Sequence, residues 1–137
     1  MADFQRPFIL QNDACGSAVA AVLMQETEDG CRPTTYASRT LTDQERQNWI
    51  YELEALAVLF GVEKFRLYLE HVEFRLQVDN QALCRVLAHP RNSGRLARWA
   101  MRLYAFRLTV EHIRGTQNII ADSLSRMFEG YTDEFGY

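Results

Sequence analysis

Cysteine is scarce in this sequence, and no long stretch of it is uniformly apolar. The three cysteines are odd in number and lack the paired spacing of zinc ligands, so we expect free thiols in a reducing, intracellular compartment such as the cytoplasm. The first five residues contain no charged-then-apolar leader, which gives no sign of secretion. No apolar run approaches the roughly 18 residues that a membrane span needs. These absences argue against disulfide frameworks, zinc-stabilised folds and membrane proteins.

Low-complexity sequence and internal repeats are missing as well. Three prolines and seven glycines in 137 residues are ordinary counts, and 24% of the residues are charged. Because 47% are hydrophobic and 12% aromatic, the chain can bury one core, but it is too short for two ordinary domains. We therefore predict one domain over residues 6–128, with residues 1–5 as added or linker sequence and the acidic, aromatic residues 129–137 as a tail or linker.

The net charge of −3 conceals a basic segment. Between Arg85 and Arg126 the chain has eight arginines and two acidic residues, a local charge of +6, so the rest of the chain carries −9. Clustered cations of this kind favour an anionic partner such as a nucleic-acid backbone, although a solvated helix face has the same appearance.

The first third of the chain is predicted to form an antiparallel meander. Apolar runs at residues 8–10 and 19–24 read as two strands of a hairpin, and residues 32–38 as a third strand. Pro33 places the start of that third strand at a sheet edge or a bulge, because proline cannot donate to the strand ladder.

A long helix is predicted next. Thr42 and Glu45 have the spacing of a capping box, and the helix is expected to reach about Tyr68. Its predicted core stripe follows helical spacing, with Leu59 and Val62 on other faces, and comprises Trp49, Leu53, Leu56, Ala57, Phe60 and Leu67.

The remaining elements alternate between strand and helix. Residues 72–78 alternate apolar and polar side chains, the clearest strand pattern in the chain. After them we predict helices at 81–87 and 95–104, a last strand at 106–110 and a closing helix at 118–127. The expected order is thus three antiparallel strands, a helix, a strand, short helices, a strand and a final helix, which is an α/β pattern.

Acidic residues occur at four places where this fold would bring them together. Asp13 and Asp79 follow predicted strands, Glu52 and Glu54 lie in the long helix, and Asp122 lies near the start of the last helix. One residue from each place would give an all-oxygen site for two hard cations, the type of site that cleaves phosphodiester bonds. Taken singly, each acid is also explained as a turn former or a helix-surface residue. Glu52 and Glu54 lie on either side of a stripe centred on Leu53, so helical periodicity does not choose between them.

Several segments, in this order, closely resemble the ribonuclease H domain of reverse transcriptases from gypsy-type LTR retrotransposons. They are residues 7–14 (Pro-Phe-Ile-Leu-Gln-Asn-Asp-Ala), 36–42 (Tyr-Ala-Ser-Arg-Thr-Leu-Thr), 52–58 (Glu-Leu-Glu-Ala-Leu-Ala-Val), 78–83 (Val-Asp-Asn-Gln-Ala-Leu) and 118–126 (Asn-Ile-Ile-Ala-Asp-Ser-Leu-Ser-Arg). The resemblance covers about residues 6–127. It implies an α/β ribonuclease H-like fold, a mixed five-stranded sheet of three antiparallel strands and two further strands with helices packed on it. The implied metal-binding carboxylates are Asp13, Glu52, Asp79 and Asp122, where the family's Glu-Leu-x-Ala pattern selects Glu52 over Glu54.

The resemblance also implies an activity. The four carboxylates would hold two Mg2+ or Mn2+ ions that cut the RNA strand of an RNA–DNA hybrid during reverse transcription and leave a 5'-phosphate and a 3'-hydroxyl. The implied partners are the hybrid and the polymerase domain of the same Pol polyprotein, with no membrane, and the implied location is cytoplasmic retrotransposon particles. Gln81, and Asn80 beside it, match the family position that contacts the minor groove.

The basic segment has a place in this hypothesis. Four arginines recur at spacings of four, three and four residues, and we predict that they meet the hybrid's phosphates; they are Arg91, Arg95, Arg98 and Arg102. Trp99, between them, is expected to pack inward.

The chain departs from the family pattern at two places. Many ribonucleases H carry a histidine on the loop before the last aspartate, but residues 114–117 (Arg-Gly-Thr-Gln) contain none. His112 is in phase with the preceding apolar alternation, so we expect it to pack at the strand end. Asn12 and Cys15 replace the threonine and serine common around the first aspartate.

Two other hypotheses stay open at this point. A noncatalytic ribonuclease H-like connection module, or a domesticated domain that binds nucleic acid or protein, would share the fold, but it has no physical need to concentrate four negative charges. A nuclease of the same fold that acts on DNA, such as an integrase or a junction resolvase, is disfavoured by the motifs between Thr42 and Arg126.

Overall fold

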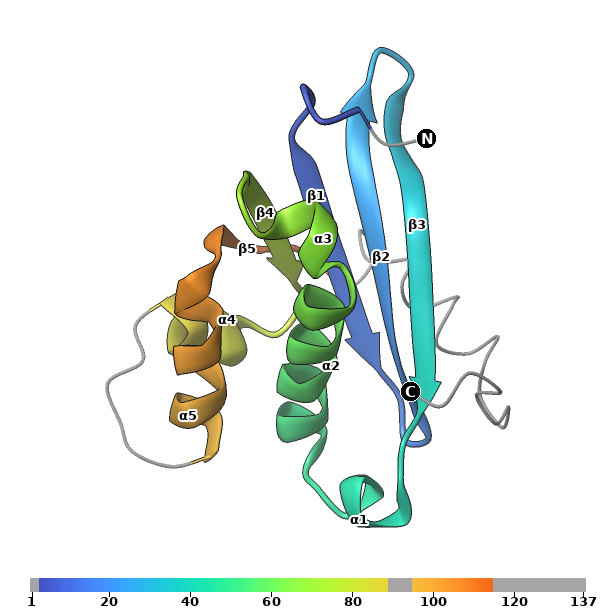
Figure 1. Cartoon of the computed structure of the whole chain (residues 1–137). Helices are drawn as coiled ribbons and strands as arrows, with labels where there is room; N and C mark the ends of the chain where they lie inside the picture. Colours follow the sequence, from blue (N-terminus) through green and yellow to red (C-terminus); the bar gives the residue numbers. More distant parts are fainter. Residues whose placement is uncertain (1–2, 89–94, 115–137) are drawn as a thin grey trace.

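The strands form one mixed five-stranded sheet of order β3-β2-β1-β4-β5 (Figure 1). The computed structural model describes residues 3–88 and 95–114. β1 (Phe8–Ala14), β2 (Ala18–Thr27) and β3 (Gly30–Thr40) form the antiparallel meander, and β4 (Glu73–Val78) and β5 (Arg107–His112) continue the sheet in parallel with β1. The predicted fold class is confirmed.

Pro33 lies where the sequence places it. β3 is an edge strand, and the β2–β3 register shifts between Leu23 and Met24, which pair with Thr35 and Pro33. Thr34 is the extra residue of this bulge, so the missing N–H of Pro33 falls where the ladder is already interrupted. The tight β2–β3 turn uses Gly30 at a φ of 103°, a conformation that costs glycine little.

Three short or medium helices replace the single long helix predicted after Thr42. They are α1 (Asp43–Arg46), α2 (Ile50–Lys64) and α3 (Arg66–Leu69). The capping box is confirmed, because the Thr42 hydroxyl accepts from the Glu45 N–H (3.1 Å) and the Glu45 carboxylate accepts from the Thr42 N–H (2.9 Å). Arg39 of β3 donates to both oxygens of Glu45 (2.7 and 3.0 Å) and holds the pKa of this carboxyl below its usual value. The end of β3 is thereby tied to α1.

The predicted core stripe of the helix is partly wrong. Trp49 precedes α2 and is 79% exposed, and Leu67, in α3, is 92% exposed, whereas Leu59 and Val62 are buried. A helical period holds only along a continuous helix. The breaks before Ile50 and at Phe65 shift the phase of the residues outside them.

The remaining helices complete one layer with α2. α4 (Gln81–Ala88) contacts β4 and β5, and α5 (Arg95–Arg102), followed by the 3-10 turn η1 (Leu103–Ala105), contacts α2 and α4. The predicted helices at 81–87 and 95–104 correspond to α4 and to α5 with η1. The predicted helix at 118–127 lies outside the described residues.

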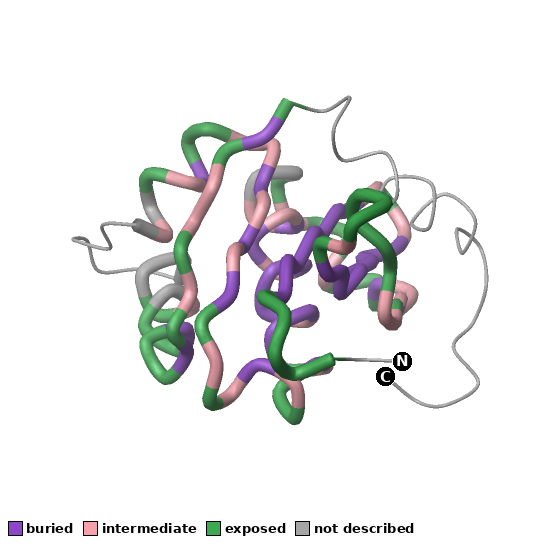
Figure 2. The backbone as a smooth tube through the Cα atoms, turned by 90° about the horizontal axis from the view of Figure 1, so that it is seen from above, coloured by how far each residue is buried: buried purple, intermediate pink, exposed green. Residues whose placement is uncertain are grey.

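The core lies between the sheet and this helical layer, and buried segments gather at the centre of the molecule (Figure 2). Phe8 and Leu10 of β1 and Phe74 and Leu76 of β4 meet Val58 and Val62 of α2 in one apolar cluster. The alternate residues Ile9, Val22 and Met24 form a separate buried cluster. Strand alternation thus places Phe8 and Leu10 on one face of the sheet and Ile9 on the other.

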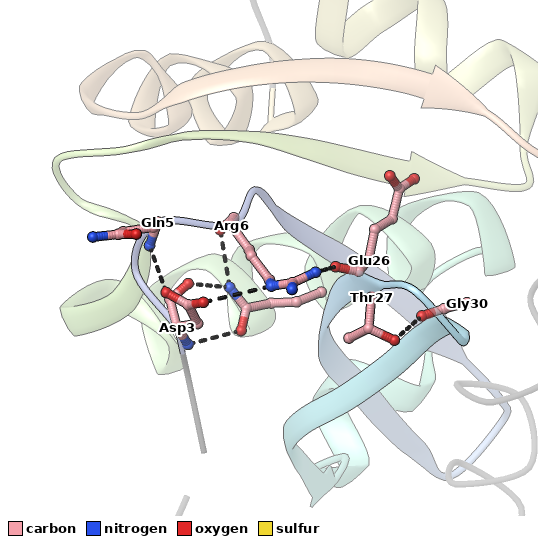
Figure 3. Close-up of polar contacts among 7 residues, drawn as sticks. Asp3, Gln5, Arg6, Glu26, Thr27 and Gly30 are labelled. Carbon is pink, nitrogen blue, oxygen red and sulfur yellow. Dashed lines mark hydrogen bonds and ion pairs between the residues drawn. The ribbon is translucent and has the colours of Figure 1, made fainter.

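Residues 3–6 are fastened to the sheet, although we expected residues 1–5 to be linker sequence. The buried Gln25 side chain accepts from the Asp3 N–H (3.0 Å) and donates to the carbonyls of Asp3 (2.6 Å) and Arg6 (2.9 Å). Arg6 also donates to the Glu26 carbonyl (3.2 Å), and these contacts gather Asp3 and Arg6 against the β2 end (Figure 3). Phe4 stacks on Tyr68 at 6.0 Å between ring centroids.

Candidate metal centre

Three carboxylates converge at one edge of the sheet. Asp13 lies near the end of β1, Asp79 directly follows β4, and Glu54 lies in α2. One carboxylate oxygen from each lies within 4.8 Å of those of the other two, the one such group of potential metal ligands among residues 3–88 and 95–114. β1 and β4 are parallel neighbours, so their carboxyl ends meet at the same edge, where α/β folds place ligands.

Glu54, and not Glu52 as we predicted, is the carboxylate that α2 contributes to this cluster. Residues 52 and 54 are about 200° apart around a helix, so only one of them can face the sheet. The face of α2 that packs on β1 and β2 is the one that carries Val58 and Gly61, and Glu54 lies within about 20° of Gly61, two turns earlier. Leu53, the centre of our predicted stripe, is also buried with Ala14 of β1 and Val19 of β2, but it lies about 100° around the helix from Glu54.

Gly61 is the residue from which the sheet-facing side of α2 could have been predicted. A Cβ atom added there would lie 2.9 Å from Ala21 Cβ and 2.9 Å from Asn12 Oδ1, closer than real Cβ atoms come. α2 therefore approaches β1 and β2 as closely as its backbone permits. A glycine inside an otherwise apolar helix marks such an approach, and the residue seven positions earlier shares its side of the helix.

The surroundings of Glu54 concentrate negative charge. Burial raises the pKa of the Glu54 carboxyl, a hydrogen bond from Asn80 opposes this shift, and the charge of Asp79 raises the pKa further. Asp79 acts on the Cys84 thiol as well, whose pKa is raised first by burial and then by this charge. A bound cation would relieve the repulsion among Asp13, Glu54 and Asp79.

The donor set fits hard divalent cations. Three carboxylates supply only oxygen ligands, the chemistry that Mg2+, Mn2+ and Ca2+ share. Asp13 is buried, whereas Glu54 and Asp79 are half-buried, so solvent reaches part of the cluster. Asp122, the fourth predicted carboxylate, lies outside the described residues.

The Asn80 side chain, which we predicted to contact substrate, makes two hydrogen bonds within the protein. Its Nδ2 donates to Glu54 Oε2 (2.9 Å), and its Oδ1 accepts from the Leu83 N–H (2.9 Å), which caps α4. Gln81, in the first turn of α4, is exposed and its side chain borders open solvent.

The four predicted phosphate-binding arginines fall in different places. Arg91 lies outside the described residues, and Arg95 begins α5 with a side chain that is likewise outside them. Arg98 is exposed. Arg102 pairs with Glu63 of α2 at 2.6 Å, so part of its charge is already neutralised. Trp99 is partly buried against the core, as predicted.

His112 does not pack at the strand end, contrary to our expectation. It is exposed, and its Nε2 lies 3.1 Å from the backbone oxygen of Asp79. Ile113, one residue later, is the buried one, and its N–H donates to the Val78 carbonyl (2.9 Å). Contacts from the end of β5 thus hold the backbone at Val78 and at Asp79.

The fold and the acidic edge together define a ribonuclease H-like domain, and comparison with known families agrees. The chain belongs to the family of RNase H-like domains found in reverse transcriptase, whose model matches residues 3–106. Among curated proteins it is 36% identical, over 126 residues, to the retrovirus-related Pol polyprotein from transposon 297 of Drosophila melanogaster. It is 34% identical, over 125 residues, to the Pol polyprotein from transposon gypsy of the same organism. The matches cover 91% and 90% of this chain but only 11% and 12% of those polyproteins.

Solved structures share the fold. LC11-RNase H1 in complex with an RNA/DNA hybrid superposes with a TM-score of 0.65 at 16% identity, covering 85% of this chain and 92% of that one. The foamy viral protease-reverse transcriptase in complex with double-stranded DNA gives a TM-score of 0.66 at 15% identity, covering 84% of this chain and 25% of that one. Within the described residues, no helix is long and apolar enough to cross a membrane.

Proposed function

We propose that this domain hydrolyses the RNA strand of RNA–DNA hybrids with two divalent metal ions, as part of a retrotransposon reverse transcriptase. The observation that carries the proposal is the convergence of Asp13, Glu54 and Asp79 at the carboxyl edge of a ribonuclease H fold. Membership of the reverse transcriptase family and the hybrid bound to LC11-RNase H1 support the choice of substrate.

Each residue has a defined part in this proposal. Asp13, Glu54 and Asp79, with Asp122 as the fourth ligand, would hold Mg2+ or Mn2+. When bound, such ions activate a water and stabilise the leaving 3'-oxygen. Asp13 and Asp79 are fixed by adjacent parallel strands, which keeps the ligand spacing constant as substrate arrives. The products would carry a 5'-phosphate and a 3'-hydroxyl.

Recognition of the hybrid would use groups beside this edge. Gln81 is exposed two residues after Asp79, where it can reach the minor groove and the 2'-hydroxyls that distinguish RNA from DNA. Arg98, with Arg91 and Arg95, would meet phosphates. The partners would be the hybrid and the polymerase domain of the same polyprotein, inside cytoplasmic retrotransposon particles.

A noncatalytic connection module is less consistent with this edge of the sheet. Three carboxylates within 4.8 Å repel one another, and burial raises the cost of ionising Glu54. A purely structural domain gains nothing from this arrangement, whereas a metal site requires it.

The proposal is tested with the purified chain and an end-labelled RNA–DNA hybrid. With Mg2+ or Mn2+ we expect cleavage of the RNA strand, none of a DNA duplex of the same sequence, and none after chelation by EDTA. Mass spectrometry of the fragments should show 5'-phosphate and 3'-hydroxyl ends. Failure to cleave with either ion at high protein concentration would contradict the proposal, as would equal cleavage of the DNA duplex.

The contribution of Arg98 is tested by salt dependence. Binding that releases counterions weakens with salt in proportion to the phosphates contacted. Arg98→Ala should weaken hybrid binding, measured by fluorescence anisotropy, and lower the slope of log K against log salt concentration by about 1.

Arg32→Ala is the matched control for this measurement. Arg32 is also exposed and pairs with an acidic neighbour, Asp29, but it lies by the β2–β3 turn, at the far end of the sheet from the carboxylates (Figure 1). The control should leave the slope unchanged. An equal slope for Arg98→Ala and the unmodified chain would place Arg98 on an ordinary solvated face.

A further inference from the structure

Asn80 is the residue that links the metal centre to helix α4. Its two amide atoms serve two elements at once, because Oδ1 caps the helix through the Leu83 N–H and Nδ2 donates to Glu54 Oε2, both at 2.9 Å. The Asn80 carbonyl also accepts from the Cys84 N–H (3.0 Å), the first helical bond of α4. Backbone and side chain together therefore fix the position of the Nδ2 donor.

This donor is aimed at only one of the two Glu54 oxygens. Glutamate has three rotatable side-chain bonds, so its carboxylate needs an outside contact to hold one orientation. Because Oε2 accepts from Asn80, we take Oε1 as the oxygen that a cation would use, and Glu54 would then be a ligand through one atom. The hydrogen bond also limits rotation of the carboxylate plane, which binding through both oxygens would require.

Cations differ in their tolerance of such a ligand. Mg2+ requires nearly octahedral geometry with short, single-oxygen contacts, whereas Ca2+ accepts six to eight ligands and often takes a carboxylate through both oxygens. A Glu54 fixed through one oxygen suits Mg2+. A Glu54 free to rotate offers Ca2+ its second oxygen.

We propose that Asn80 is a positioning residue that makes the site selective for Mg2+ over Ca2+ by restricting Glu54 to one-oxygen coordination. The inference rests on the proposed function, since it assumes that the carboxylate cluster binds divalent cations. It assigns Asn80 a part in ion choice through Glu54, a role separate from the substrate contact predicted from the sequence.

Asn80→Ser is the sharpest test, because serine keeps an oxygen to cap α4 but lacks the amide Nδ2 that reaches Glu54. The metal-free chain and the variant are titrated with MgCl2 and with CaCl2, and affinity is measured by calorimetry and by the rise in unfolding temperature. Loss of a group that orients a metal ligand typically weakens binding about 10- to 100-fold. We expect a loss of this size for Mg2+ and a loss of less than about threefold for Ca2+.

A second variant guards against a folding defect. Asn80→Thr also keeps a capping oxygen, lacks the amide donor and adds no charge, and its Mg2+ to Ca2+ affinity ratio should move in the same direction. Equal losses for both ions, or no loss for either, would overturn the inference. If the unmodified chain binds neither cation, the proposed function itself fails. If it binds both and the variants keep the same selectivity, only the role of Asn80 fails.

Discussion

Glu54→Gln is expected to lower metal-dependent cleavage of the hybrid by at least about 100-fold, whereas Glu52→Gln should keep most of the activity. Changes to residues that merely orient a ligand cost up to about 100-fold, so loss of a ligand charge should cost no less. Glutamine keeps the length of Glu54 and an oxygen that still accepts from Asn80, so the packing of α2 is preserved. Only the negative charge is removed.

The measurement is the single-turnover cleavage rate at saturating Mg2+, with Asp79→Asn as a second ligand variant expected to fail equally. Thermal unfolding without metal separates chemistry from folding. Neutralising one of three clustered carboxylates relieves repulsion, so neither variant should unfold below the temperature of the unmodified chain.

Glu52 is the matched control because it lies in the same helix, two residues away. The reverse result, loss with Glu52→Gln and retention with Glu54→Gln, would restore the prediction made from the sequence and contradict the geometry of the cluster. Equal activity of Asp79→Asn and the unmodified chain would remove this edge of the sheet as the active site.

Gly61→Val is expected to lower the free energy of unfolding by about 3 kcal/mol and to reduce cleavage as well. Overpacking a core costs about 1–3 kcal/mol, and here even the first added carbon would meet Ala21 and Asn12 at 2.9 Å. Ala21 is fully buried in β2 and cannot yield without moving the strand. α2 must therefore move outward, and Glu54 moves with it.

Urea denaturation measures the loss of stability. Gly61→Ala should cost less, about 1 kcal/mol, because alanine regains roughly 1 kcal/mol of helix propensity against the clash. Gly16→Ala is the matched control, since nothing lies within 4 Å of a Cβ at Gly16 and its φ is not positive, and it should change stability by less than about 0.5 kcal/mol. A Gly61→Val chain as stable as the unmodified one would show that α2 does not depend on this close approach.

Local patterns predicted the elements that depend on local interactions. The alternation over 72–78 became β4, the capping box at Thr42 formed as expected, and Pro33 fell in a bulge of an edge strand. Each of these depends on neighbours within a few residues, or on a side-chain period of two that any strand must keep.

The errors arose where tertiary contacts decide. Trp49 and Leu67 have the spacing of a core stripe but lie outside α2, in segments whose phase is set by the helix breaks on either side. His112 is in phase with the strand but exposed, because β5 ends there and the next residue, Ile113, enters the core.

The sequence by itself determined the fold class, the family and two of the strand-end carboxylates, Asp13 and Asp79, because strand ends follow from local pattern and turn residues. Only the tertiary structure decided between Glu52 and Glu54. That choice depends on the rotation of α2 about its own axis. The rotation is set by packing between distant segments, which includes the close approach of Gly61 to Ala21 and Asn12, residues about 40 and 50 positions earlier in the chain. The tertiary structure also showed that Asn80 donates a hydrogen bond to Glu54. These two residues are 26 positions apart, so no local pattern encodes their contact.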